Sequence, residues 1–237
     1  MRAQDPGDRF AAIARELLAQ PSTEATADRI SEMAVEVIRG CDHAGISLVE
    51  HRKIRTIAAT DGVVAEGDRR QYALDEGPCL DTIRDHETIR APRLATEDRW
   101  PRWAPSVSSE LGVQSMLCFQ LFTSDHSYGG INLYSDRPMA FDAHDEAVGL
   151  ALAAHAAVAL AASQTITTLN NAVGSRTAIG QAEGILMERF GLTADQAFSV
   201  LVRVSQNDNR RLALVAEELV KTRRIPGLPT DSGTDQP

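Results

Sequence analysis

The chain has 237 residues, 43% of them hydrophobic, which is enough for one large domain or for a medium domain plus a small one. Its net charge of −9 argues at face value against a nucleic-acid partner. Three widely separated cysteines without a Cys-x-x-Cys pair, and six histidines without ligand spacing, predict neither disulfides nor a bound metal or other cofactor.

Two helices are expected first, at residues 8–18 and 23–38, each with an apolar stripe and a capping residue before it. The apolar pattern then changes to that of strands, which are bounded by turn residues. The expected strands are residues 44–50, 54–60, 88–91, 113–123 and 128–134. Short helices are expected at 63–72 and 79–85, and an irregular segment at 92–105. The pair Gly129-Gly130 indicates a bulge or the close approach of a ligand or a second backbone.

A long helix is expected to begin near Phe141 and to continue without proline to Phe190. At 1.5 Å per residue, a helix of about 49 residues spans roughly 73 Å, so it would bridge two domains. Small and apolar residues at heptad-like spacing predict a homodimeric coiled coil over residues 142–173, although its first turns could also pack on the sheet. The residues of this expected seam are Leu152, His155, Ala159, Ala162, Ile166, Leu169 and Val173.

Two shorter helices follow, one capped by Thr193 and ending near Gln206, and one over residues 210–222 capped by Asn209. Residues 226–237 lack a regular apolar pattern, and we expect a disordered tail there. Charge is uneven along the chain: residues 170–225 carry +2, whereas residues 1–169 carry −9. A mildly basic second domain is compatible with nucleic-acid binding, and also with an ordinary solvated surface.

No secretory signal is expected, because the first ten residues carry acids and no apolar stretch. The alanine-rich segment 147–162 contains Gly149 and His155, which indicates a packed helix and not a membrane span. We therefore expect a cytoplasmic protein with no membrane partner.

About twenty positions in order resemble the ANTAR family of antitermination domains, over residues 169–225. The central run is Ser175-Arg176, then Ile179-Gly180-Gln181-Ala182, then Gly184 to Arg189, followed by Gly191-Leu192-Thr193, Ala197-Phe198, Leu201, Ser205, Leu212 and Ala216. The resemblance implies a three-helix domain that, as a dimer, binds stem-loops in nascent RNA and favours an antiterminator hairpin. The RNA-binding candidates are Ser175, Arg176, Gly180, Gln181, Glu183, Gly184, Arg189, Ser205, Asn209, Arg210 and Arg211.

Helical phase refines these candidates. Ile179, Ala182, Leu186 and Phe190 are expected in the core, which leaves Arg176, Gln181 and Gly184 facing outward. Each glycine costs a helix about 1 kcal/mol relative to alanine. Two reasons could explain that cost: close packing of the other two helices, or contact with RNA. Glu183 departs from the family, which usually has lysine there.

Residues 22–163 resemble a GAF domain, through the segments Asp75–Asp81, Arg99–Trp103, Ser115–Leu117 and Tyr128–Leu133. The resemblance implies an antiparallel sheet with helices and a pocket for an unknown small ligand. Candidate pocket walls are Cys79, Trp100, Trp103, Tyr128 and Leu133, each of which could instead be simple core.

The expected fold is therefore α+β: a GAF-like antiparallel sheet with helices, joined by a long coiled-coil helix to an all-α three-helix bundle. The expected parts are an N-terminal helix (1–21), a GAF-like sensor (22–163), a connecting helix (142–170), an ANTAR domain (169–225) and a tail (226–237). We expect a regulator and not an enzyme. Two alternatives stay open: a DNA-binding helix-turn-helix over 193–222, and a thiol reductase that uses Cys79 and Cys118.

Overall fold

The computed structural model describes residues 6–50, 53–85, 88–123 and 127–224, so the expected disordered tail at 226–237 lies outside the described residues. The chain forms two compact units, residues 1–165 and 166–237. The helices are Pro6–Leu18 (α1), Thr23–Val37 (α2), Gly62–Leu74 (α3), Pro78–Asp85 (α4), Trp103–Glu110 (α5), Ala143–Phe190 (α6), Ala194–Asn207 (α7) and Leu212–Thr222 (α8), with a 3₁₀ turn at Leu94–Thr96 (η1). The strands are His43–Glu50 (β1), Lys53–Ala59 (β2), Ile89–Ala91 (β3), Ser115–Phe122 (β4) and Ser127–Ser135 (β5).

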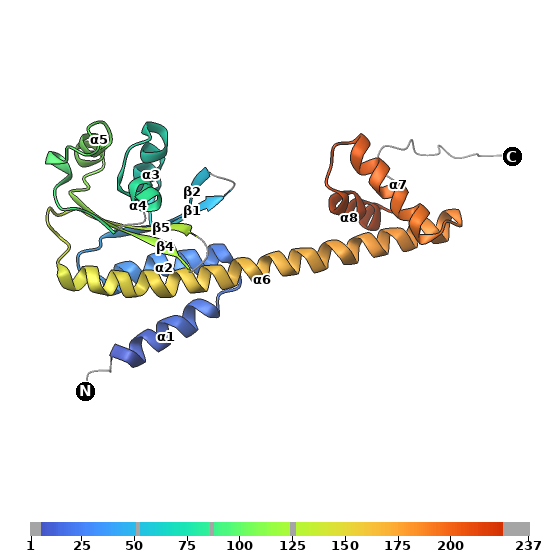
Figure 1. Cartoon of the computed structure of the whole chain (residues 1–237), viewed down its shortest axis with the longest axis horizontal. Helices are drawn as coiled ribbons and strands as arrows, with labels where there is room; N and C mark the ends of the chain where they lie inside the picture. The colour runs from blue at the N-terminus through green and yellow to red at the C-terminus, as the bar shows by residue number, and fades with distance from the viewer. Residues whose placement is uncertain (1–5, 51–52, 86–87, 124–126, 225–237) are drawn as a thin grey trace. The chain divides into compact units, whose positions relative to one another are not determined.

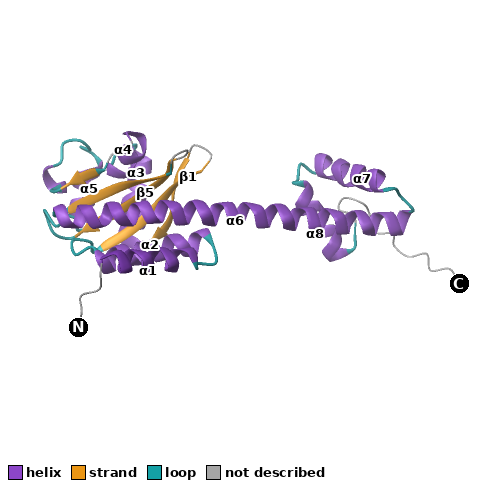
Figure 2. Cartoon of the chain, turned by 60° about the horizontal axis from the view of Figure 1, so that its bottom comes forward, coloured by secondary structure: helices purple, strands orange, loops and turns teal. Residues whose placement is uncertain are grey.

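The first unit is built on one antiparallel sheet in the order β2-β1-β5-β4-β3 (Figure 1). Helix α2 and the first part of α6 cover one face, with α1 lying outside them against α2, while α3, α4 and α5 cover the other face (Figure 1 and Figure 2). Alternate strand residues supply the two cores, because successive side chains point to opposite faces. Ile131 and Leu133 pack toward α2 and α6, whereas Tyr134 packs toward α3 and α5. The expected α+β class with a GAF-like sheet is confirmed.

Gly129 explains the glycine pair in β5. It pairs with Leu48 of β1 and has φ +156°, a conformation that L side chains rarely adopt. A Cβ at this position would lie 1.8 Å from the carbonyl oxygen of Ser47. The close approach of a second backbone therefore requires glycine here. The pairing of β5 with β4 also shifts register between Leu121 and Phe122, beside Gly129, so the structure shows both the close approach and the bulge expected from the sequence.

The segment expected to be irregular, 92–105, instead contains η1 and the start of α5. Pro105 lies in the first turn of α5, where a missing N–H removes no helical hydrogen bond. Trp103, Ala104 and Val107 of this helix are fully buried. A proline in the first turn is therefore compatible with a helix that the sequence pattern did not predict.

Helix α6 has 48 residues, as the absence of proline predicted. Among the described helices it alone is long and apolar enough to suit a membrane span by composition. Its first part is instead a core helix of the sheet unit, since Leu152, Ala156 and Leu160 are fully buried there. Leu152 and Ala159 therefore do not belong to a dimer seam, which corrects the expectation for the N-terminal half of the 142–173 segment.

Candidate functional site

The second unit is a three-helix arrangement made by the C-terminal part of α6 with α7 and α8. Thr193 caps α7 through a capping box with Gln196, which satisfies backbone N–H groups that a helix start leaves unpaired. The core of this unit is small and aliphatic. Its buried members are Ala178, Ala182, Leu186, Ala197, Leu201, Val215, Ala216 and Leu219.

The helical phase expected for α6 is only partly right. Ala182 and Leu186 are buried as expected, and Ile179 is partly buried. Phe190 is 52% exposed, so its assignment to the core is wrong. The helix ends at Phe190 and Gly191 turns the chain with φ +64°, so this last side chain lies beyond the packed turns. The core stripe instead begins at Ala178.

Gly180 and Gly184 lie on the exposed side of α6. A Cβ at either position would meet no atom within 4 Å, apart from the helix's own neighbouring backbone. Close packing of the other two helices therefore does not explain these glycines, and that alternative is wrong. The remaining explanation from the sequence, contact with a molecule outside this chain, stays a prediction.

A groove of about 540 Å³ runs between α6 and the end of α8. It is lined by Gln181, Gly184, Ile185, Glu188, Arg189, Val220 and Arg223. Arg189 donates from Nη1 to the carbonyl oxygen of Arg223 at 2.7 Å, which connects the two helix ends. Two arginines, one carboxylate, an amide and a bare stretch of helix backbone therefore share one concave surface.

Three of the RNA-binding candidates, Gln181, Gly184 and Arg189, thus line this one groove. Sequence reasoning missed Arg223, which ends α8 in the left-handed conformation with φ 60°. Its position after the last apolar residue of α8 was the available signal. Arg176 and Gly180 are exposed on α6 outside the groove, and Ser175 and Glu183 are half-buried.

The other candidates gather at the turn between α7 and α8. Ser205 donates to the carbonyl oxygen of Arg210 at 2.5 Å, and Arg210 forms an ion pair with Glu218 at 2.6 Å. Asn209 has φ 50° and does not cap α8, which begins at Leu212 with Arg211 in the N-cap position. The expected cap at Asn209 is therefore wrong, because this residue makes the left-handed turn itself.

The candidate residues therefore do not form one site: some line the groove, some lie at the turn between α7 and α8, and Ser175, Arg176, Gly180 and Glu183 lie on α6 outside both. Helix α8 has 11 residues, so its ends are about 16 Å apart. The groove lies at its C-terminal end and the Arg210–Arg211 turn at its N-terminal end. Of the turn group, Arg211 is exposed, whereas Ser205 and Arg210 are occupied with contacts that hold the turn.

The candidate pocket residues of the first unit do not line one cavity. Cys79, Trp100 and Trp103 lie on the α3–α5 side of the sheet, and both indoles are hydrogen-bonded. Leu133 lies on the other face, in the core with α2 and α6. The side chain of Tyr128 lies outside the described residues. Alternation along β5 separates Leu133 from the tryptophans, so Leu133 cannot share their pocket.

A buried polar network occupies this side of the sheet, centred on Asp68 of α3, which is fully buried. Burial raises the pKa of this carboxyl, while hydrogen bonds oppose that shift. Its five donors are Tyr134 Oη, Asn132 Nδ2 at 3.0 Å, Gln71 Nε2 at 3.1 Å, Thr56 Oγ1 at 2.8 Å and Ser47 Oγ at 3.4 Å. Sequence reasoning missed this network, although Asp68, Gln71 and Tyr72 have the three- and four-residue spacing of one helix face.

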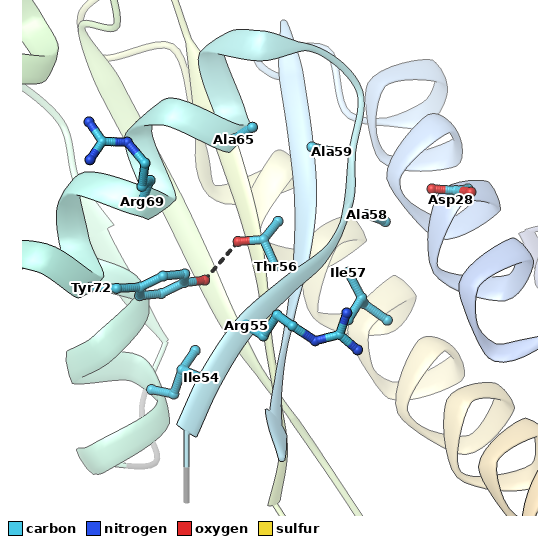
Figure 3. Close-up of a pocket in the computed structure, with 10 residues that line it drawn as sticks. All are labelled: Asp28, Ile54, Arg55, Thr56, Ile57, Ala58, Ala59, Ala65, Arg69 and Tyr72. Carbon is cyan, nitrogen blue, oxygen red and sulfur yellow. Dashed lines mark hydrogen bonds between the residues drawn. The ribbon is translucent and has the colours of Figure 1, made fainter. Parts of the chain in front are cut away.

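Outside the network, a cleft of about 480 Å³ opens along β2 (Figure 3). Ile54, Thr56 and Tyr72 lie on its α3 side, whereas Arg55 and Asp28 lie on its α2 side. The hydroxyl of Tyr72 is 2.8 Å from Thr56 Oγ1 and 2.8 Å from Ser47 Oγ. Thr56 and Tyr72 therefore belong both to the cleft and to the network around Asp68.

The three cysteines are free and buried. Burial raises the pKa of the Cys41 and Cys79 thiols to about 12 each and raises the pKa of Cys118 well above its ordinary value. Neutral thiols are poor nucleophiles. Among the described residues, no three His, Cys, Asp or Glu side chains are grouped so that they could hold a metal ion.

Solved structures with a similar fold are GAF domains and a small reductase. The GAF domain of an Acinetobacter phosphoenolpyruvate-protein phosphotransferase is 15% identical, with a TM-score of 0.55 over 69% of this chain and 97% of that one. Free methionine-R-sulfoxide reductase from Neisseria meningitidis is 14% identical, with a TM-score of 0.53 over 70% of this chain and 96% of that one. At such identities the likeness shows the fold alone.

No curated protein matches the chain. Two family models match it: the GAF domain over residues 20–161 and the ANTAR domain over residues 167–220. The GAF match covers more than half of the chain and the whole sheet, and the ANTAR match covers the three-helix unit. The chain therefore belongs to the GAF domain family, and it carries an ANTAR domain after its GAF domain.

Proposed function

We propose that this protein is a cytoplasmic transcription antitermination regulator that binds paired stem-loops of nascent RNA through its ANTAR domain. The GAF domain senses a small molecule or helps to hold two copies together. The observation that carries this proposal is the ANTAR match over residues 167–220, combined with the exposed groove of the same three-helix unit. Arginines suit phosphate contact, and an exposed glycine permits a nucleotide to approach the helix backbone.

The groove supports recognition of a single-stranded loop better than recognition of a duplex. A loop presents unstacked bases, which fit concave sites and accept hydrogen bonds from amides and guanidinium groups. Gln181, Arg189 and Arg223 supply such groups beside Gly184. Arg176 and Arg211 are exposed outside the groove, where contact with the flanking phosphates would add affinity without sequence preference.

Two copies of the chain are proposed to meet through α6 after the sheet unit. Ile166, Leu169 and Val173 are 58%, 60% and 64% exposed at spacings of three and four residues, which places them on one helix face. An unpartnered apolar stripe of this kind is typical of a helix that pairs with a copy of itself. Leu169→Glu is expected to give a monomer in light scattering, whereas Asn171→Glu, about 200° away around the helix, is expected to leave the mass unchanged. A dimeric Leu169→Glu variant would place the seam elsewhere.

The two alternatives have less support. A helix-turn-helix would present α8 to the major groove of DNA, yet Val215, Ala216 and Leu219 are buried. The exposed charges of α8 are Glu217 and Lys221, which offset each other, so the available face is not basic. A thiol reductase would need an accessible thiolate. Burial instead raises the pKa of Cys79 to about 12.

Binding titrations test the proposal. The probe is a pool of RNAs with two adjacent hairpins and randomised loops, compared with duplex DNA and unstructured RNA of equal length. We expect enrichment of a loop sequence and tighter binding to the selected hairpin pair. Arg176→Glu and Arg211→Glu should weaken that binding at least tenfold, whereas Arg203→Glu, an exposed charge of α7 that is not among the RNA-binding candidates, should change it little. Tight binding to duplex DNA without hairpin binding would reject the proposal.

A further inference from the structure

The two edges of the GAF sheet differ in what they offer to a further strand. Strand β3, at one edge, has three residues, and Arg99 Nη2 donates to the carbonyl oxygen of Arg90 in it at 2.8 Å. Strand β2, at the other edge, has seven residues. An edge strand keeps main-chain N–H and C=O groups on its outer side, where another strand can pair with them. The β2 edge is therefore the longer pairing surface of this sheet.

The cleft of about 480 Å³ follows this edge (Figure 3). It is lined by the consecutive residues 54–59, whose side chains point toward α3 on one side of the strand and toward α2 on the other. Because both faces of the strand line one cleft, the outer main-chain edge of β2 forms its floor. Ala65 and Tyr72 of α3 stand on one side of this floor, and Asp28 of α2 stands on the other.

The floor of the cleft determines the kind of occupant that fits. A row of main-chain donors and acceptors is complemented in series by another extended main chain. The walls beside the floor are apolar and mostly small, as Ile54, Ala59 and Ala65 show, so they suit side chains of modest size. Valine and threonine are side chains of this size that favour extended structure. The occupant that fits is therefore an extended peptide with β-branched side chains.

Charge at the edge selects among such peptides. Both charged residues of β2, Lys53 and Arg55, are basic and exposed. Together with Arg69 they outnumber the acids beside them, Asp28 and Glu66, by one, although the chain as a whole is acidic. A second copy of β2 would bring basic residues together across the new pair, and like charges on paired strands are destabilising. An acidic strand would instead be stabilised by the same residues.

We propose that the β2 edge is a docking site for an extended, acidic peptide segment of a partner protein, which adds to the sheet as a further strand between α2 and α3. This inference goes beyond RNA binding, because it gives the GAF domain a protein partner of its own. It does not depend on the groove of the second unit, and peptide binding is measured without RNA, so its failure can be told from a failure of the proposed function.

The test is a fluorescence anisotropy titration of the full chain with a labelled, amidated peptide of sequence Glu-Val-Thr-Val-Thr-Glu. One control peptide is N-methylated at all central residues, which keeps the side chains and removes the main-chain donors. Another control has lysine in place of both glutamates. We expect saturable binding of the acidic peptide, binding at least tenfold weaker for the N-methylated peptide, and weaker binding for the lysine peptide. Equal binding of the N-methylated peptide, or no saturable binding of the acidic one up to its solubility limit, would overturn the proposal.

Hydrogen exchange locates the contact on the backbone. With the acidic peptide bound, amides of β2 that face the cleft should gain protection, whereas those of β3 at the opposite edge should not. A peptide held by side chains alone would leave the exchange of β2 as it was. Unchanged exchange of β2 at saturating peptide would therefore reject strand addition.

Variants test the walls and the charge of the cleft. Ala65→Trp should lower the affinity for the acidic peptide at least tenfold, because Ala65 is an exposed cleft residue of α3 and a bulky side chain there would block entry. Ala73→Trp, at an exposed position of α3 outside the cleft, is its control. Arg55→Glu should reverse the preference, so that the lysine peptide binds better than the acidic one. Unchanged affinity in folded Ala65→Trp would reject the assignment. A mass that rises with protein concentration, and no longer rises in Ala65→Trp, would show that a second copy occupies the edge and would overturn the peptide assignment.

Discussion

Gly184→Ala separates stability from RNA binding. Gly184 lies inside α6, is exposed, and would place an added Cβ in open space. The substitution therefore restores helix propensity without a clash, which stabilises the second unit by about 1 kcal/mol. For a domain of this size, that corresponds to a rise of roughly 4–8 °C in melting temperature.

The same methyl group stands in the groove that we propose contacts RNA. If a loop nucleotide approaches the helix backbone at Gly184, the added carbon should weaken binding by at least about 1.4 kcal/mol, or tenfold. Gly174→Ala is the matched control, because Gly174 is also exposed on α6 with nothing within 4 Å of an added Cβ, and it is not a groove residue. It should give the same gain in stability and no loss of affinity.

The assay combines circular dichroism melts with fluorescence titrations of the selected hairpin pair, and light scattering confirms that the mass is unchanged. A less stable Gly184→Ala protein would show that the glycine serves contacts within the chain. A more stable variant with full RNA affinity would remove Gly184 from the RNA-binding surface.

Three further predictions concern charge, core packing and pH. Glu183→Lys changes the charge on the proposed RNA-binding helix by two units, which at about 8 Å from a phosphate is worth roughly 1 kcal/mol before salt screening. The affinity for the hairpin pair in low salt should therefore rise about fivefold. An unchanged affinity would place Glu183 away from the RNA. Leu186→Ala removes a side chain that is 1% exposed in the small core of the second unit, and it should lower the unfolding free energy of that unit by about 2–5 kcal/mol. Calorimetry should show a lower melting temperature for the second unit and an unchanged one for the GAF domain. A joint shift of both melting temperatures would contradict independent cores. His43 contacts the carboxylates of Asp61 and Asp136; burial lowers its pKa, but these partners raise it more, so the net pKa lies above its ordinary value. The stabilisation by protonated His43 is therefore complete below pH 6.5 and is lost as the pH rises through the higher folded-state pKa. In His43→Gln, the unfolding free energy measured in urea should depend less on pH across that range. An equally steep pH dependence in the variant would assign the effect to another group.

Regular elements could be predicted where periodicity and caps agree. The absence of proline predicted the full length of α6, and Thr193 predicted the start of α7. Helix α5 could not be predicted in this way, because Pro105 lies in a first turn that tolerates it. Helical phase alone predicts Phe190 in the core, because phase does not tell where the packed turns of a helix end.

The sequence could predict which residue types form the candidate site, but not which of them lie together. Gln181, Gly184 and Arg189 could be selected from the ANTAR-like run, yet their partner Arg223 is brought to them only by the packing of α8 on α6. Around Asp68, the sequence shows polar residues far apart, and only the antiparallel sheet gathers them beneath α3. Polar residues inside a core carry no periodic signal of their own, which is why that network was missed.

Transcription in vitro tests the central claim most directly. The template carries the selected hairpin pair, with the second hairpin overlapping one arm of a terminator, and a matched template has both loops scrambled. We predict that the purified protein raises read-through on the first template alone, and that Arg176→Glu abolishes this effect. Unchanged read-through on the first template, at protein concentrations that saturate the hairpins, would contradict an antitermination role.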